Sequence, residues 1–288
     1  MRIPESELII NADGSAFHIH IRPEDLADNI ILVGDPGRVQ MVADFFDGIE
    51  TRGASREFVF ATGVRKGKRY TALSTGIGTD NIDIVMTELD ALANVNFDTR
   101  EVRGTHRTLK ILRIGTTGAL HPDIPLGSFI FSHVSVGFDG LLNWYADRDK
   151  VADAAMEKAF YEQVRWDEHL PKPYFVHASD ELIKRFEDCT VKGVTISASG
   201  FYGPQGRVVR QPLALPHLLE DVEAYRFGDL RITNFEMEGS ALAGLAAHLG
   251  HEAGTVCCAI ANRYLHSSNT DYKPQVRKLV ELALDRLA

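Results

Sequence analysis

The sequence predicts a layered α/β fold with a central mixed β-sheet flanked by helices, organised as a single domain over residues 1–288. Two observations support this prediction. Short apolar runs, typical of buried strands, alternate with segments of helical periodicity along most of the chain. Residues 58–64 and 69–74 alternate in polarity around Lys66-Gly67-Lys68, which is typical of a hairpin, so the sheet is expected to contain antiparallel strands.

Glycine-rich segments follow several of the expected strands. In the first of them Asp35 suits a helix N-cap and Pro36 a first helical turn, so a helix should begin there. Ligands of α/β sheets bind beyond the carboxyl ends of the strands. We therefore expect three such segments to line one pocket: 34–37 after a strand at 30–33, 76–78 after the strand at 69–74, and 115–118 as a turn that closes a strand at 109–114.

The remaining elements follow from the same patterns. Residues 82–93 keep helical spacing, and the polar stretch 96–108 should be an exposed insertion. We expect further strands at 128–136, 174–178, 191–198, 231–235 and 254–261, and helices at 152–165, 179–187, 215–225, 238–249 and 273–287.

Composition excludes several classes of protein. Hydrophobic residues make up 44% of the chain and charged residues 25%, as in ordinary globular proteins. The formal net charge is −9 without a basic stripe, which argues against a nucleic-acid or membrane-surface partner. The chain has no long apolar run and no apolar signal core, and its three cysteines form no framework. We therefore expect a cytoplasmic location.

Common cofactor and catalytic motifs are absent. Gly76-Ile77-Gly78 is followed by Asn81 rather than by a third glycine, so it is not a dinucleotide fingerprint. The sequence contains neither a G-x-x-x-x-G-K-[ST] loop nor a G-x-S-x-G elbow. The only tight histidine pair, His18 and His20, has no third ligand at metal spacing, so we expect no metal site.

Arginines and polar groups stand where expected strands end. Arg38, Arg56 and Arg113 could supply forked donors to a phosphate dianion, although a single arginine is more often a solvated surface residue. Arg113 differs because it interrupts the apolar run 109–114, where a charge needs a partner.

Two further segments offer polar groups that could bind a small ligand. In 201–207, Gln205 and Arg207 could read the amide edge of a flat heterocycle while Phe201 stacks on it, or the segment is an ordinary polar loop. In 234–240 two carboxylates flank Met237, where they could bind sugar hydroxyls, bind a metal or cap a helix. Arg263 ends an apolar strand and could equally be a surface terminus.

Taken in order, these motifs resemble the nucleoside phosphorylases, and most closely the uridine phosphorylases. The resemblance extends from Phe17-His18 to Asn262-Arg263. Its motifs are Gly34-Asp35-Pro36-Gly37-Arg38, Ser55-Arg56-Glu57-Phe58, Ser74-Thr75-Gly76-Ile77-Gly78, Arg113-Ile114-Gly115-Thr116-Thr117-Gly118, Phe201-Tyr202-x-x-Gln205-x-Arg207 and Phe235-Glu236-Met237-Glu238.

The resemblance implies a role for each matching residue. Phosphate would be bound by Gly34, Arg38, Arg113, Thr116 and, from a neighbouring subunit, Arg56. Ribose would be bound by Glu236, Met237, Glu238 and a neighbour's His18. Uracil would be read by Gln205 and Arg207 beside Phe201, with support from Arg263, and the groups acting in catalysis would be Arg207, Gln205, Arg113 and Glu238.

The resemblance implies phosphorolysis of uridine by a homo-oligomer, at least a dimer with shared active sites. Inorganic phosphate would be the co-substrate, and no organic cofactor is expected. Bacterial members can hold a monovalent cation near the positions of Glu57, Ile77 and Asn81, although Asn81 departs from their pattern. The alternatives are a purine nucleoside phosphorylase or a nucleosidase of the same fold, and a non-catalytic nucleoside-binding protein.

Overall fold

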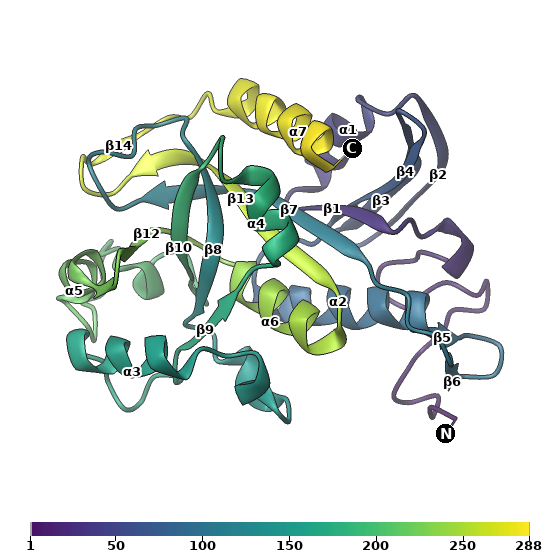
Figure 1. Cartoon of the computed structure of the whole chain (residues 1–288), viewed down its shortest axis with the longest axis horizontal. Coiled ribbons are helices and arrows are strands. Elements are labelled where there is room, and N and C mark those ends of the chain that lie inside the picture. Colours follow the sequence, from purple (N-terminus) through teal and green to yellow (C-terminus); the bar gives the residue numbers. More distant parts are fainter. Residues whose placement is uncertain (1, 288) are drawn as a thin grey trace.

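The computed structural model describes residues 2–287, which form one large sheet with helices packed against both faces (Figure 1). The strands are β1 (Asn29–Val33), β2 (Gly48–Ser55), β3 (Phe58–Arg65), β4 (Lys68–Ser74), β5 (Val95–Asn96), β6 (Glu101–Val102), β7 (Lys110–Ala119), β8 (Phe129–Gly137), β9 (Tyr174–His177), β10 (Val191–Ser197), β11 (Arg226–Phe227), β12 (Leu230–Glu236), β13 (Glu252–Asn262) and β14 (Ser267–Ser268). The helices are α1 (Pro36–Ala43), α2 (Thr79–Asn94), α3 (Ala154–Gln163), α4 (Asp180–Phe186), α5 (Leu218–Ala224), α6 (Gly239–Leu249) and α7 (Lys273–Leu287).

Alternate residues of the central strands face opposite helical layers. Ile30 and Leu32 of β1 pack in one core with residues of α2 and α6, whereas Ile31 and Val33 pack in another core with residues of α1, α4 and α7. Figure 1 shows α1 and α7 on one side of the sheet and α2 and α6 on the other. This period-2 division explains why the first strand is apolar at every position after Asn29. The predicted layered α/β fold with a mixed sheet is confirmed.

The sheet closes partly on itself. Its strands follow the order β11-β12-β10-β8-β13-β7-β1-β4-β3-β2, and β12 also pairs with β7 through Phe235↔Gly118 and Asn234↔Ala119. The strands β12, β10, β8, β13 and β7 therefore form a closed ring. This closure places the end of β12 directly beside the second half of β7, although the two strands are more than a hundred residues apart in the sequence.

Most predicted elements are confirmed, and the exceptions have physical causes. The hairpin of β3 and β4 turns at Lys66 and Gly67, both with positive φ, as a two-residue turn requires. The predicted turn at 115–118 is wrong, because β7 continues to Ala119, held by β13 on one side and by β12 near its end. The strand β2 was not predicted, because four of its first five residues are exposed and the strand has no apolar run.

The insertion at 96–108 is exposed over most of its length, as predicted, and contains the short pair of β5 and β6. Among residues 2–287, none of the helices combines the length and the apolar character that crossing a bilayer requires.

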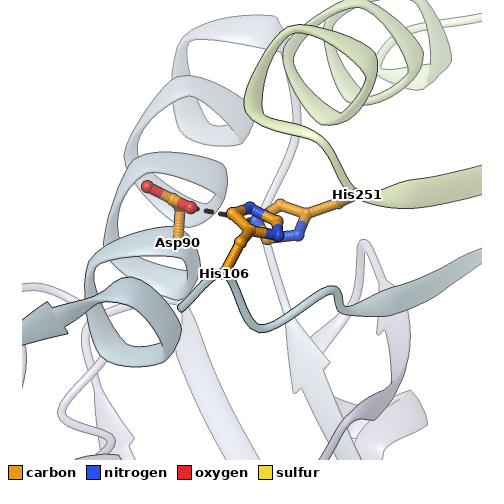
Figure 2. Close-up of side chains that lie close together, drawn as sticks. All are labelled: Asp90, His106 and His251. Carbon is orange, nitrogen blue, oxygen red and sulfur yellow. Dashed lines mark hydrogen bonds and ion pairs between the residues drawn. The ribbon is translucent and has the colours of Figure 1, made fainter. Parts of the chain in front are cut away.

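Two histidines and a carboxylate meet where this insertion joins the sheet. Asp90 of α2, the exposed His106 and the buried His251 offer ligand atoms within 4.8 Å of one another (Figure 2). However, Nδ1 of His251 accepts a hydrogen bond from the backbone N–H of Leu109 at 3.1 Å, so its proton lies on Nε2 and points to Asp90, also at 3.1 Å. A metal-bound histidine normally donates a proton from its other nitrogen. The arrangement therefore fits a hydrogen-bonded link better than a metal site.

We predict that His251→Ala destabilises the protein by about 2 kcal/mol or more, because it leaves the buried Leu109 N–H without a partner and opens a cavity. The matched control is His106→Ala, which removes an exposed ring and should cost about 0.5 kcal/mol. Urea-induced unfolding of both variants measures the difference. Equal stability of the two variants would contradict this link.

Candidate active site

Ten of the predicted site residues line one cavity of about 530 Å³. The three glycine-rich segments converge on it as expected, since Gly34, Gly76 and Gly118 all belong to its wall. The parallel strands β1, β4 and β7 run in the same direction, which brings their carboxyl ends to one edge. The predicted site residues in the wall are Gly34, Arg38, Arg113, Thr116, Phe201, Gln205, Arg207, Glu236, Met237 and Glu238.

A buried ion cluster forms one side of the cavity. Arg113 of β7 pairs with Glu236 through Nη1 at 3.0 Å and with Glu238 through Nη2. All three side chains are at least 95% buried, and the two carboxylates raise the pKa of Arg113 above its usual value against the cost of burial. The sequence indicated that Arg113 needed a partner, and the structure supplies two.

The two carboxylates differ in what they can still accept. Glu238 receives hydrogen bonds from Gly78 N–H at 2.8 Å and from Arg113, which leaves acceptor sites free on both oxygens. Burial raises the pKa of Glu238 above that of an ordinary glutamate, and Arg113 opposes this shift. Glu236 receives more hydrogen bonds, from Ser197, Arg113 and the first amides of α6.

A second group of cavity residues carries unneutralised donors near the start of α1. Asp35 caps this helix by accepting from Gly37 N–H at 2.8 Å, and Pro36 occupies its first turn, both as predicted. Arg38 has no carboxylate within 4.0 Å among residues 2–287. The hydroxyl of half-buried Thr116 makes no hydrogen bond within the same residues. A free guanidinium and a free hydroxyl on one wall suit an oxyanion.

Two further arginines, Arg207 after β10 and Arg263 directly after β13, have no carboxylate partner within 4.0 Å among residues 2–287. The guanidinium of Arg207 lies 3.9 Å from the ring centroid of Phe201 and donates to Oε1 of Gln205, whose Nε2 has no partner among the described residues. Arg263 lies outside the cavity wall but donates to the Gln205 carbonyl at 3.0 Å, which holds this segment in place. Burial and the nearby Arg263 lower the pKa of Arg207 to about 10. This part of the cavity therefore favours a ligand that carries or develops negative charge.

His18 and Arg56 do not line the cavity of their own chain. Nδ1 of His18 donates to Oε1 of Glu88 at 2.6 Å, and the same carboxylate also accepts from the backbone N–H groups of His18 and Ile19. Arg56 is exposed in the turn between β2 and β3, with a φ of 53°. The chain thus presents both residues away from its own pocket.

The predicted cation position contains a hydrogen bond. Asn81 donates from Nδ2 to Oε1 of Glu57 at 3.1 Å, so the amide presents its positive end to the carboxylate. A cation would need the amide oxygen instead, so these two residues as arranged do not fit one.

Several contributing residues were missed by the sequence reasoning. Ser197 ends β10 and contacts Glu236, Glu88 anchors His18, and Cys257 lies 3.9 Å from Nη1 of Arg113. Ser197 lies four positions before Phe201, where the motif at 201–207 begins, and Glu88 is the only acid among the buried residues of α2, so each carried a weak signal. Cys257 carried none, because a cysteine in an apolar strand is usually a small core residue.

Comparisons with known proteins identify the family. The fold is α/β. Its cavity combines Arg113, which is paired with two carboxylates, with Arg38 and Arg207, which have no carboxylate partner among residues 2–287. The chain belongs to the phosphorylase superfamily, whose family model matches residues 28–288.

Individual relatives span most of the chain. A uridine phosphorylase of Thermococcus kodakarensis is 30% identical over 254 residues, which cover 87% of this chain and 79% of the relative. One of Salmonella typhimurium is 31% identical over 258 residues, with 86% of each chain covered. The crystal structure of a Trypanosoma brucei nucleoside phosphorylase, described as showing uridine phosphorylase activity, is 28% identical, with a TM-score of 0.89 over 97% of this chain and 99% of that one.

We predict that turnover falls on the acid side with an apparent pKa above that of an ordinary glutamate, because burial raises the pKa of Glu238 and protonation removes its charge. Glu238→Gln should be far less active than the wild type at alkaline pH. The ratio of its rate to the wild-type rate should rise as the pH falls, because Glu238 of the wild type then becomes protonated and neutral.

Parallel pH–rate profiles measure this ratio, and the ionisation of phosphate cancels because all proteins share the buffer. Glu57→Gln is the matched control, since Glu57 lies outside the cavity wall and its variant should keep the wild-type profile. A constant ratio for Glu238→Gln would contradict the assignment.

Proposed function

We propose that this protein catalyses the phosphorolysis of uridine, which gives uracil and ribose 1-phosphate. The observation that carries the proposal is the pairing pattern of the cavity: Arg113 is neutralised by carboxylates, whereas Arg38 and Arg207 have no carboxylate partner among residues 2–287. Free cations in a chain of net charge −9 are expected where anions bind. The uridine phosphorylases among its relatives support the choice of nucleoside.

Each group then has a distinct task. Phosphate lies against Arg38 and Thr116, from which it attacks C1′ of the ribose and balances the positive charge that develops there. Glu238 accepts hydrogen bonds from the ribose hydroxyls with its free lone pairs.

The leaving uracil spreads negative charge onto its oxygens, and Arg207 and Gln205 stabilise that charge electrostatically. Among residues 2–287 no carboxylate lies within 4.0 Å of Arg207, so we assign no general acid. The reaction requires no organic cofactor, because phosphate is the co-substrate.

We also propose that the active unit is at least a homodimer with two-fold symmetry. The motifs that contain His18 and Arg56 are intact, yet neither side chain lines the cavity of its own chain. In a two-fold dimer each subunit lends the same patch to the other, so both residues could complete the neighbouring cavity.

The three free cysteines fit the reducing conditions of the cytoplasm, where we expect the protein to act.

We predict that uracil is released from uridine only when phosphate is present.

We also predict that Arg38→Ala raises the KM for phosphate by about tenfold to a hundredfold, because a hydrogen bond to a charged group contributes ~1.5–3 kcal/mol. The control is Arg52→Ala, which removes an exposed arginine of β2 whose guanidinium donates to Gln40 at 2.6 Å and does not line the cavity.

Uridine absorbance, followed with and without phosphate, gives the result. Equal rates without phosphate would identify a nucleosidase, equal cleavage of inosine would favour a purine enzyme, and no turnover would leave a nucleoside-binding protein.

We predict that two inactive variants restore activity when mixed. Arg56→Ala removes the lent arginine and Arg207→Ala removes one in the subunit's own cavity, so each alone should be nearly inactive. Random reassortment makes half of the dimers mixed, and each mixed dimer has one intact cavity, so about a quarter of all cavities should recover. If mass measurement shows subunit exchange but activity stays absent, Arg56 acts within its own chain.

A further inference from the structure

A buried hydrogen-bond network lies directly behind Glu238 and joins four elements. Ser197 at the end of β10 donates to Oε1 of Glu236 and accepts from the backbone N–H of Ser240 in α6 at 2.8 Å. The hydroxyl of Ser240 in turn donates to Asp139 at 2.9 Å, and Tyr174 donates to the same carboxylate. Every side chain of this network is buried except that of Asp139, which is partly buried, and burial makes an unpaired member costly.

Glu236 has no acceptor capacity left for a ligand. Its Oε1 receives Ser197 and the N–H of Gly239 at 3.0 Å. Its Oε2 receives the N–H of Glu238 at 2.9 Å, the N–H of Gly239 at 2.9 Å and Nη1 of Arg113 at 3.0 Å. A carboxylate has about four lone-pair sites, so Glu236 is saturated by protein donors. Only 1% of its side chain is exposed, although it belongs to the cavity wall.

Glu238 depends on the same donors for its position. It is the N-cap residue of α6, and the first amides of that helix are held by Glu236 and Ser197. Its charged partner, Arg113, is held from the other side by Glu236. A shift of Glu236 would therefore move both the backbone and the ion-pair partner of Glu238.

We propose that Ser197 and Glu236 are positioning residues, which fix Arg113 and Glu238 for the ribose hydroxyls without touching the substrate themselves. The inference rests on the proposed function, because it assigns Glu238 to the ribose. It differs from the role that the family resemblance implied for Glu236, which was direct contact with the sugar.

Ser197→Ala tests this proposal. The substitution leaves the Ser240 amide unpaired and Glu236 with one donor fewer. Its matched control is Ser132→Ala, which removes an equally buried hydroxyl of β8 that donates to Thr195 at 2.7 Å and does not contact Glu236. Ser240→Ala is a milder second variant, since it removes the bond to Asp139 and keeps the amide.

The measured quantity is the ratio of kcat/KM for uridine to that for 2′-deoxyuridine, which lacks one ribose hydroxyl. Ser197→Ala should lower kcat/KM for uridine by about tenfold or more and reduce the ratio severalfold, as loss of a hydrogen bond to a charged group would do. Ser240→Ala should shift the ratio in the same direction by less. Ser132→Ala should leave the ratio unchanged, whatever its thermal stability.

The outcomes separate the two claims. If the wild type turns over uridine and Ser197→Ala and Ser240→Ala both keep the ratio of Ser132→Ala, the positioning role is refuted and the proposed function stands. If the wild type does not release uracil from uridine with phosphate present, the proposed function fails and the positioning role fails with it.

Discussion

The buried cluster of Arg113, Glu236 and Glu238 is the constraint on which the rest of the site depends. Removing three charges from water is expensive, and close ion pairs offset this cost only when the remaining polar atoms are also bonded. Glu236 meets this condition through Ser197 and the first amides of α6. Glu238 meets it in part, through Gly78, and Nε of Arg113 has no partner among residues 2–287. The cluster exists because β12 closes the sheet against β7, which brings residues of distant sequence into contact.

The cluster also determines how charge is distributed in the cavity. Arg113 is paired twice, so the phosphate role that the family resemblance gave it must be shared with its carboxylates. Arg38, Arg207 and Arg263 have no such partners within residues 2–287, and the low pKa of Arg207 reflects its burial and the nearby Arg263. The cavity thus combines a fixed carboxylate, which suits hydroxyl groups, with free cations, which suit phosphate and a departing base.

The sequence predicted local features well and distant pairings poorly. Strand and helix periodicity, the Asp35 cap and the hairpin at Lys66 depend on neighbouring residues, so they could be predicted. The need of Arg113 for a partner followed from its apolar run, but its partners lie over 120 positions away. The predicted turn at 115–118 failed because strands on both sides keep this glycine-rich segment extended. The family resemblance named residues such as Glu236 and His18, whereas their hydrogen-bond partners, Ser197 and Glu88, became evident only in three dimensions.

A crystal structure of the protein with ribose 1-phosphate bound tests the central claim most directly, because it locates both parts of the ligand at once. The account predicts that the sugar hydroxyls contact Glu238, that the phosphate contacts Arg38 and Thr116, and that Glu236 keeps its bonds to Ser197 and α6. A complex in which Glu236 turns from Ser197 to contact the sugar, or in which the phosphate avoids Arg38, would contradict it.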